Sequence, residues 1–315
     1  PASSWQQLLN QYIGGGDVPD VFFHEKDEPN YSQWLEDDYL FDYSQFLDDY
    51  PNLKREFAKY PEKELKFYLG GGYYSYPIML KAGENAPEVV SDHALYYRRD
   101  WYDNLVAKNW TPSSGRSLKD PEDESFNYEN FYDLCEGFTY GDPDNNSATD
   151  TYAYCMHKDG GVYMWYPLFS MFGVMSEGWY QDETGKWMPE CISDEMKEAI
   201  WWIAEMYDNG FINSNYSTTM TSDGMRSEFS TGMAGMMVDV GTYTNGVNIM
   251  NLMEDYTSDT KPMKDVVRAM PVVIGKNGEK MMLGITNKYG YLAINNDLSS
   301  NKKKRIMAVM DYMLS

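Results

Sequence analysis

The feature that most constrains the fold is the alternation of helical segments with short apolar runs along the whole chain. Apolar residues recur at offsets of three and four over residues 1–13, which predicts a helix, and three consecutive glycines follow it. After an Asp-Val-Pro-Asp segment, the apolar run at residues 21–23 is bounded by turn residues and predicts a buried strand. Helix, loop and strand in this order are typical of α/β folds.

The same alternation continues to the last residues. The clearest helix covers residues 194–209, with Ser193 as N-cap, acidic residues in the first turn and Gly210 after the last one. No internal repeat is visible, so we predict an α/β protein with mixed sheets covered by helices. Further helices are predicted at 35–50 (short ones), 51–68, 98–105, 126–138 and 301–314, strands at 73–78, 95–97, 235–240 and 266–274, and a surface loop at 111–125.

The charge of the chain limits its partners. The 315 residues include 49 Asp and Glu against 26 Lys and Arg, a formal net charge of -23, which repels phosphate backbones and anionic headgroups. Nucleic acid is therefore not expected as a partner. No apolar run approaches the roughly 20 residues that span a bilayer, and no charged and then apolar leader precedes Pro1. We expect the chain as given to be soluble.

Aromatic residues are the compositional excess. Tyr, Phe and Trp make up 16% of the chain, and core packing accounts for most of them. A water-filled cleft whose aromatic side chains stack on sugar rings would also explain this aromatic content. The three cysteines, Cys135, Cys155 and Cys191, are odd in number and widely spaced, so we expect thiols without a metal or disulfide role.

Five ordered segments resemble the extracellular solute-binding proteins of carbohydrate ABC importers, in particular the large lipoprotein branch found in gut Firmicutes. Any one of them alone would be weak, and their order and rough spacing carry the resemblance. The segments are Gly-Asp-Val-Pro-Asp-Val at 16–21, Tyr-Tyr-Ser-Tyr-Pro at 73–77, Tyr-Arg-Arg-Asp-Trp at 97–101, Asp-Pro-Asp-Asn-Asn at 142–146 with Asp-Thr-Tyr at 150–152, and Phe-Ser-Thr-Gly-Met-Ala-Gly-Met at 229–236.

This resemblance implies a type II periplasmic-binding-protein fold, with two α/β lobes, a hinge and an interlobe cleft. It places residues 1–98 plus 272–315 in an N-lobe and residues 99–271 in a C-lobe, with crossings near 95–100 and 266–274. The family begins with a lipobox cysteine and a further strand, and it continues past the last helix. We therefore expect the first strand of the N-lobe and the C-terminal part of the C-lobe to be missing from the chain.

The resemblance also implies which residues face the cleft. An aromatic platform with carboxylates and amides at its rim binds both the apolar faces and the hydroxyls of a sugar. For each residue the alternative, a packed core ring or a solvated surface charge, stays open. The candidate ligand-binding residues are Glu25, Tyr76 and Arg98 from the first lobe and the first crossing, Trp165, Tyr166, Asp239 and Tyr243 from the second lobe, and Tyr289 on the returning strand.

An acidic loop is the candidate metal site. The spacing of its oxygen-bearing side chains matches the first part of an EF-hand loop, in which position seven offers its backbone carbonyl. Ser147 stands at position six in place of the usual Gly, and Ala153 stands at position twelve in place of the final Glu. The resemblance makes structural calcium one possibility, and an Asx-rich turn is the other. Positions one, three, five, seven and nine are Asp142, Asp144, Asn146, Ala148 and Asp150.

Signals of catalysis are absent where they would be diagnostic, since the chain has no H-E-x-x-H, G-x-S-x-G or phosphate-binding glycine motif, and His24, His93 and His157 are isolated. We expect a monomeric, extracytoplasmic receptor that captures an oligosaccharide, delivers it to an ABC permease and needs no cofactor. It would be lipid-anchored in the full-length protein and would touch the membrane only in that way. The alternatives are a glycoside hydrolase-like enzyme with an aromatic cleft, because acid pairs abound, and an adhesive surface protein.

Overall fold

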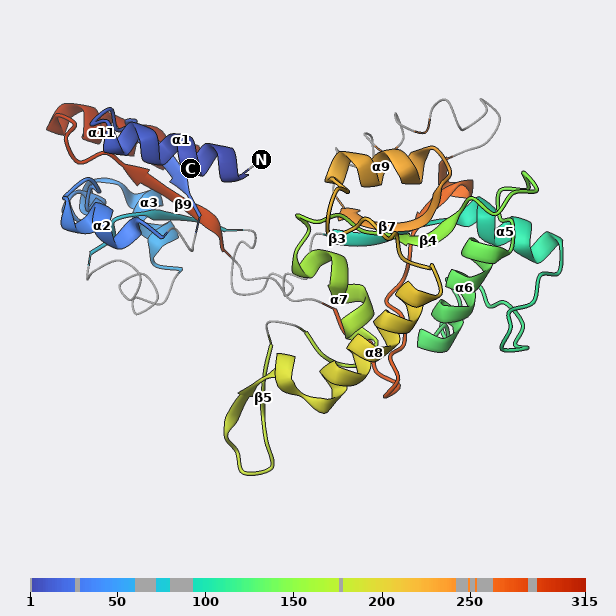
Figure 1. The fold of residues 1–315 in the computed structure, drawn as a ribbon. Coiled ribbons are helices and arrows are strands. Elements are labelled where there is room, and N and C mark those ends of the chain that lie inside the picture. Colours follow the sequence, from blue (N-terminus) through green and yellow to red (C-terminus); the bar gives the residue numbers. More distant parts are fainter. Residues whose placement is uncertain are drawn as a thin grey trace. The chain divides into compact units, whose positions relative to one another are not determined.

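The chain forms two compact units. The computed structural model describes residues 2–25, 29–59, 72–79, 93–175, 178–241, 249, 253, 263–282 and 288–315 (Figure 1). The first unit comprises Pro1–Val89 and Ile285–Ser315, and the second comprises Val90–Gly284. The predicted boundaries at 98/99 and 271/272 differ from these, because the expected crossing segments form strands of the second unit. Both stretches lie in one sheet, where they pair with each other.

The first unit is built on a three-stranded sheet. Strands β1 (Val21–His24) and β2 (Tyr76–Met79) both pair antiparallel with β9 (Lys288–Ile294), so β1 and β2 run parallel to each other. Leu9 of the first helix packs with Phe22 of β1 and Trp34 in one apolar cluster. The helices are α1 (Ala2–Gly14), α2 (Tyr31–Glu36), α3 (Pro51–Phe57) and α11 (Ser300–Met313), with short 3-10 turns at Tyr43–Gln45 and Leu47–Asp49.

The second unit contains a four-stranded mixed sheet of order β4-β7-β3-β8. Strand β4 (Tyr152–Cys155) is parallel to β7 (Ala234–Val240), and β3 (His93–Arg98) is antiparallel to β7 and to β8 (Val267–Ala269). Figure 1 shows α9 on one face of this sheet and α6 and α7 on the other. The helices are α5 (Arg99–Ala107), α6 (Tyr128–Tyr140), α7 (Val162–Ser170), α8 (Asp194–Asp208) and α9 (Ser222–Ser230).

One close contact fixes α6 against this sheet. A side chain at Gly235 of β7 would meet the Phe138 ring of α6 at 2.2 Å, so only glycine lets the ring lie on the strand. The remaining elements of the second unit are a hairpin of β5 (Trp179–Gln181) and β6 (Trp187–Pro189), and 3-10 turns at Glu190–Ile192 and Met263–Asp265.

Local sequence signals account for helix α8, the helix that was predicted most clearly from the sequence. The Ser193 hydroxyl accepts a hydrogen bond from the Met196 backbone N–H at 3.0 Å, and Asp194 and Glu195 lie in the first turn of α8, where the helix dipole favours negative charge. Gly210 follows the helix with φ of +69°, a conformation that other residues adopt at a cost. The predicted helix at 194–209 is confirmed to within one residue.

One predicted strand was too long, and two helices were not predicted. The predicted strand at 266–274 is only Val267–Ala269, because strand pairing with β3 ends at Ala269. Helices α7 and α9 were not predicted, since α7 contains Pro167 and α9 is mostly polar. Within the described residues, no helix is both long enough and apolar enough to span a membrane.

Candidate functional site

In α/β sheets, binding residues gather beyond the carboxyl ends of the parallel strands. In the second unit, β4 and β7 run parallel and end at one edge of the sheet, where β3 begins, because His93 pairs with Val240. Five side chains on the strand ends, on α7 and on α9 lie at or next to this edge, and the second-unit edge is defined here as these five. They are His93, His157, Tyr163, Arg226 and Asp239.

An aromatic stack forms one part of the second-unit edge. The Tyr163 and His93 rings lie nearly parallel, at 14°, with centroids 4.0 Å apart, and both are only partly buried. Tyr163 stands in the first turn of α7, which begins after Gly161, whose φ of +52° suits glycine. The Tyr166 hydroxyl donates to the His93 carbonyl at 2.9 Å and so holds the strand end against the same helix. The geometry thus presents a supported ring that could carry the apolar face of a ligand.

A buried ion pair forms the second part. Arg226 donates from Nε to Asp239 Oδ2 at 2.6 Å and from Nη2 to Asp239 Oδ1 at 3.0 Å, and the Asp239 side chain is 4% exposed. The hydrogen bonds that Arg226 donates to Asp239 are the largest cause that raises the pKa of the guanidinium. Such a fork fixes both side chains at the end of β7. Asp239 was predicted from the resemblance, whereas Arg226 was missed because it lies on the unpredicted helix α9.

His157 is the third part. Its side chain is half-buried just after β4, and within the described residues its Nδ1 atom is buried and has no hydrogen-bond partner. Burial lowers the pKa of His157, an effect that Asp159 and Asp239 oppose and that Arg226 and His93 reinforce. The imidazole is therefore neutral near pH 7, and a neutral imidazole has one donor and one acceptor nitrogen. A polar ligand group could use that capacity.

The first unit has a comparable edge. Because β1 and β2 are parallel, their carboxyl ends lie at the end of the sheet where β9 begins. Glu25 follows β1 directly and is exposed, and the pairing of His24 with Tyr291 brings the Tyr289 backbone to the same edge. The Tyr289 side chain lies outside the described residues. The structure thus brings Glu25 and the start of β9 together, as a sheet of this order requires.

Three other candidates lie in packed surroundings. Tyr76 is the first residue of β2 and pairs with Leu292 of β9. Its ring packs edge-on against Phe57, with ring centroids 5.5 Å apart, and burial raises the pKa of its hydroxyl. Trp165 packs against Tyr216, with ring centroids 5.4 Å apart. Tyr166 is 6% exposed. We therefore regard Tyr76, Trp165 and Tyr166 as packing residues, because their rings complete apolar clusters. Tyr243 lies outside the described residues.

Arg98 lies deepest among the predicted site residues. Its side chain is 0% exposed, and it donates from Nε and Nη2 to the two Asp100 oxygens at 2.8 and 2.7 Å. The guanidinium also lies 4.9 Å from the centroid of the Trp101 ring. A guanidinium that is enclosed in this way stabilises the junction of β3 and α5, so we regard Arg98 as a structural residue.

The acidic loop folds around Asn146. The Asn146 side chain donates to Asp144 Oδ2 at 2.8 Å and to the Asp150 carboxylate at 3.2 Å. The Ser147 backbone N–H donates to Asp142 Oδ1 at 3.0 Å. Ser147 has φ of +64°, the conformation for which an EF-hand loop uses Gly at that position. Burial, with Asp150 and Asp142 nearby, raises the pKa of Asp144. In the described part of the chain no group of three or more His, Cys, Asp or Glu side chains is placed to hold a metal ion.

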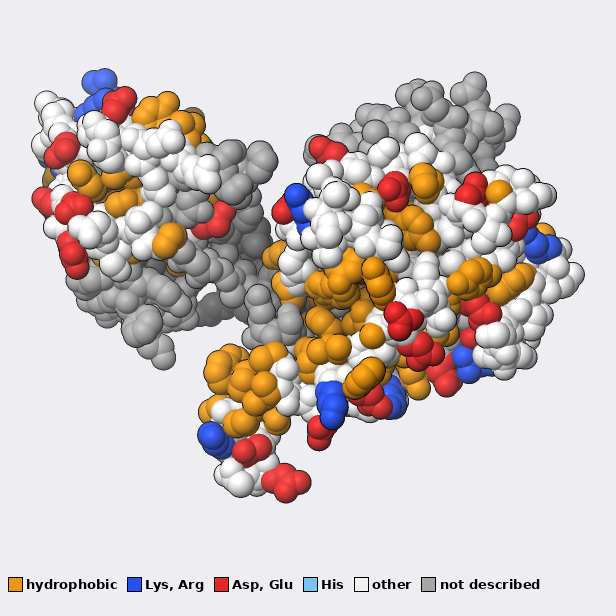
Figure 2. Space-filling model, viewed as in Figure 1, with side chains coloured by type: hydrophobic (Ala, Val, Ile, Leu, Met, Phe, Trp, Pro, Cys, Tyr) orange, Lys and Arg blue, Asp and Glu red, His pale blue; other side chains and the backbone are white. Residues whose placement is uncertain are grey.

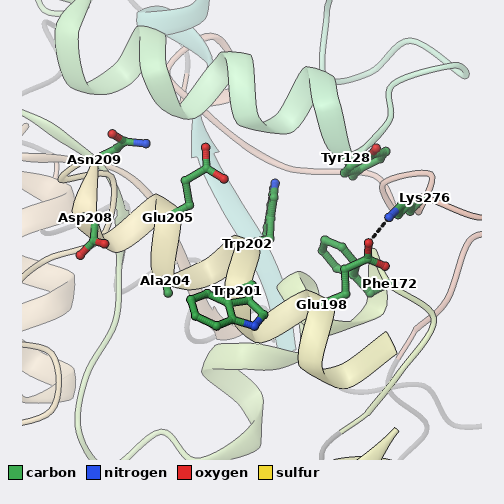
Figure 3. Close-up of a pocket in the computed structure, with 10 residues that line it drawn as sticks. All are labelled: Tyr128, Phe172, Glu198, Trp201, Trp202, Ala204, Glu205, Asp208, Asn209 and Lys276. Carbon is green, nitrogen blue, oxygen red and sulfur yellow. Dashed lines mark hydrogen bonds and ion pairs between the residues drawn. The ribbon is translucent and has the colours of Figure 1, made fainter. Parts of the chain in front are cut away.

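A separate cavity of about 520 Å³ lies along α8 in the second unit (Figure 3). Trp201, 70% exposed, lies flat on the helix, and an ion pair joins Lys276 to Glu198 across the cavity. Figure 2 shows apolar side chains gathered over the β5 hairpin and the adjoining helices of this unit. None of the residues that line the cavity belongs to the second-unit edge: Tyr128, Phe172, Glu198, Trp201, Trp202, Ala204, Glu205, Asp208, Asn209 and Lys276.

Two curated relatives come from Bacillus subtilis strain 168. Lipoprotein LipO is 24% identical over 285 residues, which are 89% of this chain and 50% of LipO. Polygalacturonan/rhamnogalacturonan-binding protein YtcQ is 22% identical over 314 residues, 99% of this chain and 55% of YtcQ. The chain thus spans about half the length of the curated relatives that it matches.

A solved structure of similar fold is the S. pneumoniae ABC-transporter substrate binding protein FusA in complex with kestose, with a TM-score of 0.68 and 18% identity, covering 96% of this chain and 57% of that one. An EF-hand mutant of FusA in complex with fructo-nystose matches with a TM-score of 0.65 and 18% identity, covering 97% and 57%. This likeness confirms the predicted fold class, a type II periplasmic binding protein with two α/β lobes. The model of the bacterial extracellular solute-binding proteins matches residues 1–315, and the chain belongs to that family.

Proposed function

We propose that this chain is the ligand-capturing receptor of an ABC importer and that its ligand is an oligosaccharide. The observation that carries the proposal is the second-unit edge, where the half-exposed Tyr163 ring, His157 and the Asp239–Arg226 pair combine an aromatic surface with fixed polar groups. A sugar ring has apolar C–H faces and a rim of hydroxyls, so this combination binds both. Membership of the solute-binding family and the sugar complexes of FusA support the same reading.

The ligand residues that we propose are Tyr163, His157 and Asp239 in the second unit and Glu25 in the first, with Tyr243 and Tyr289 as candidates from the sequence. Tyr163 and His157 were not singled out as ligand residues from the sequence. His157 lies just beyond the carboxyl end of β4 and Tyr163 lies in the first turn of α7, but neither element was predicted from the sequence, so no sequence signal pointed to these two residues.

Isothermal titration of the full-length protein with plant and host oligosaccharides tests the proposal. One-to-one binding of an unaltered sugar is expected, and Tyr163→Ala should weaken it by roughly fivefold to a hundredfold, because burying an aromatic platform contributes on the order of 1–3 kcal/mol. Trp201→Ala, which removes an exposed aromatic ring outside the edge, is the control and should leave the affinity unchanged. No binding across the panel would contradict the oligosaccharide assignment.

The same mixtures decide between receptor and enzyme. We propose that the chain is not a catalyst, since neither the sequence motifs nor the second-unit edge offers a pair of carboxyl groups free for acid and base roles: Asp239 is held by Arg226. Chromatography of the sugars after long incubation should show no cleavage products. Products that disappear in an Asp239→Asn variant would establish a hydrolase instead.

Calcium binding by the acidic loop is a second, structural proposal. We propose Asp142, Asp144, Asn146 and Asp150 as side-chain ligands and the Ala148 carbonyl as a further one, because the carboxylates already converge on Asn146. The EF-hand in the name of one FusA structure supports the idea for that fold. Millimolar calcium should raise the melting temperature of the wild type and not of Asp144→Ala, whereas an Asx-rich turn alone predicts no calcium response in either.

The remaining proposals concern the cellular location, the oligomeric state and the protein partners of the chain. We propose an extracytoplasmic location with a lipid anchor in the full-length protein, because a curated relative is a lipoprotein, and a monomeric state with ABC permease subunits as partners. Fractionation of the native host with radiolabelled palmitate tests the anchor. Size-exclusion chromatography with light scattering tests the monomer.

A further inference from the structure

Helix α8 carries a second apolar stripe that is exposed in the second unit. Ile200, Ala204 and Tyr207 follow one another at offsets of four and three, so they lie on one side of the helix, next to Trp201. Ile200 is 53% exposed, Trp201 70% and Tyr207 40%. This stripe is distinct from the face that packs on the unit, which consists of the four residues that the helix buries: Met196, Ala199, Ile203 and Met206.

Two cavities lie along the exposed stripe. One is the cavity of about 520 Å³ shown in Figure 3, and the other, of about 380 Å³, lies between α7 and α8. Ala204 and Asp208 line both cavities, so the two adjoin on the outer side of α8, and together they are called the α8 groove here. The smaller cavity is walled mainly by apolar side chains: Trp165, Phe169, Ile200, Tyr207, Ile212 and Tyr216.

The walls of the α8 groove are held in place by contacts of their own. The Tyr216 ring packs edge-on against Trp165, with centroids 5.4 Å apart, and against Tyr207, with centroids 6.0 Å apart. The Tyr207 hydroxyl donates to the Ser214 carbonyl at 3.3 Å. The groove is therefore a formed surface, and a groove with fixed apolar walls beside a helix suits an amphipathic segment that lays its apolar side chains into it.

The charges around the α8 groove are mostly negative. Three carboxylates, those of Glu198, Glu205 and Asp208, line the larger cavity together with one ammonium group, that of Lys276. Lys276 pairs with Glu198, which leaves the other two carboxylates without a cation among the lining residues. Charge complementarity therefore favours an occupant whose apolar face is flanked by Lys or Arg.

The relatives of similar fold contain enough further chain to supply this occupant. FusA matches 96% of this chain with a TM-score of 0.68, yet the match covers only 57% of FusA, so more than two-fifths of that protein lies outside it. An exposed apolar face of this extent is uncommon on the free surface of a soluble protein. A segment of the same polypeptide is tethered to the unit and so reaches the groove at a high effective concentration.

We infer that the α8 groove is the docking surface for a segment of the full-length protein that lies outside residues 1–315. The segment is amphipathic, its apolar side chains fill the groove, and its Lys or Arg side chains face Glu205 and Asp208. The inference goes beyond the proposed function, because it concerns the packing of the second unit and not the ligand that the unit binds.

Photo-crosslinking of the full-length protein identifies the occupant directly. The aromatic photo-crosslinker p-benzoylphenylalanine replaces Trp201, and mass spectrometry after irradiation identifies the linked peptide. A link within one molecule to a peptide outside residues 1–315, with Lys or Arg beside apolar residues, is expected. The control carries the same group at Val106 of α5, which is 47% exposed and lines neither cavity, and it should give no such link. A link to a peptide within residues 1–315, a crosslinked dimer, or no more product at position 201 than at position 106 overturns the inference.

A second measurement does not depend on the crosslinker. In the full-length protein, Trp201→Gln should lower the urea midpoint of unfolding by about 1 M or more, because a ring that is covered by a docked segment is lost from an apolar contact. Val106→Gln, the same change of polarity at an exposed residue, should shift the midpoint by less than about 0.3 M. Glutamine adds no charge, so repulsion from Glu205 does not contribute. Equal small shifts for the two variants would show that Trp201 faces solvent in the full-length protein and would overturn the inference.

Discussion

Replacing Arg98 by methionine should destabilise the second unit while sparing the ligand site. The substitution keeps most of the side-chain volume but removes a guanidinium that is 0% exposed and holds Asp100, itself 7% exposed, through two hydrogen bonds. The carboxylate then stays buried without its counterion. Removing one partner of a buried ion pair typically costs about 3–5 kcal/mol, mainly because the remaining charge is left without compensation.

The loss is measurable by urea unfolding followed by circular dichroism. For a unit of this size a urea m-value of about 2.5 kcal/mol/M is expected, so the midpoint should fall by about 1–2 M. Arg268→Met is the matched control, because the Arg268–Glu122 pair lies at the surface with side chains 33% and 38% exposed, and such pairs contribute about 1 kcal/mol or less. If Arg98→Met unfolded like the wild type but lost affinity for sugar, the structural role argued for Arg98 would be refuted.

Three further results are expected. Tyr163→Phe should retain most of the sugar affinity that Tyr163→Ala loses, since the ring and not the hydroxyl forms the platform, and titration of both variants checks this. Burial lowers the pKa of His157 below its ordinary value of 6.5, so the unfolded chain binds this proton more readily; stability is then complete above about pH 6.5 and falls as the pH drops below it. Melting temperatures at pH 7.5 and 5.5 should therefore differ less for His157→Gln than for the wild type, and an equal or larger difference would contradict the burial argument. Ser193→Ala should cost about 1 kcal/mol of unfolding free energy by urea titration, because the Met196 N–H loses its cap, and no change would show that the cap contributes nothing.

The elements with strong local signals were predicted well. The helix at 194–209 had an N-cap, a periodic apolar face and a terminal glycine, and each signal acts within a few residues of the chain. Helix α9 has an N-cap, Thr221, and an acidic residue in its first turn, but it lacks a periodic apolar face, because Ser, Asp, Gly, Arg and Glu make up most of it and only Met225 and Phe229 are buried apolar residues. Its position against β7 comes from tertiary packing, and so does the role of Arg226.

The candidate site residues also fall into two groups: those whose position the sequence indicated and those whose surroundings only the structure shows. Asp239 and Glu25 were placed at strand ends by the order of the segments, and the structure finds both at sheet edges. Arg98 and Tyr76 are equally polar or aromatic in the sequence, yet their surroundings are a buried carboxylate and a core ring. Residue type alone does not show whether such a side chain points into a core or out of it, because this depends on the elements that pack around it.

The sequence by itself determined the α/β alternation, the acidic character and the family, because each depends on residue types and their order. Only the tertiary structure decided which residues share an edge. Strand order brings His93, His157 and Asp239 together from three distant segments, and the antiparallel β9 unites the first unit across more than 200 residues. The physical reason is that pairing between distant strands is selected by the packing of the whole unit, whereas helices, turns and net charge follow from local chemistry.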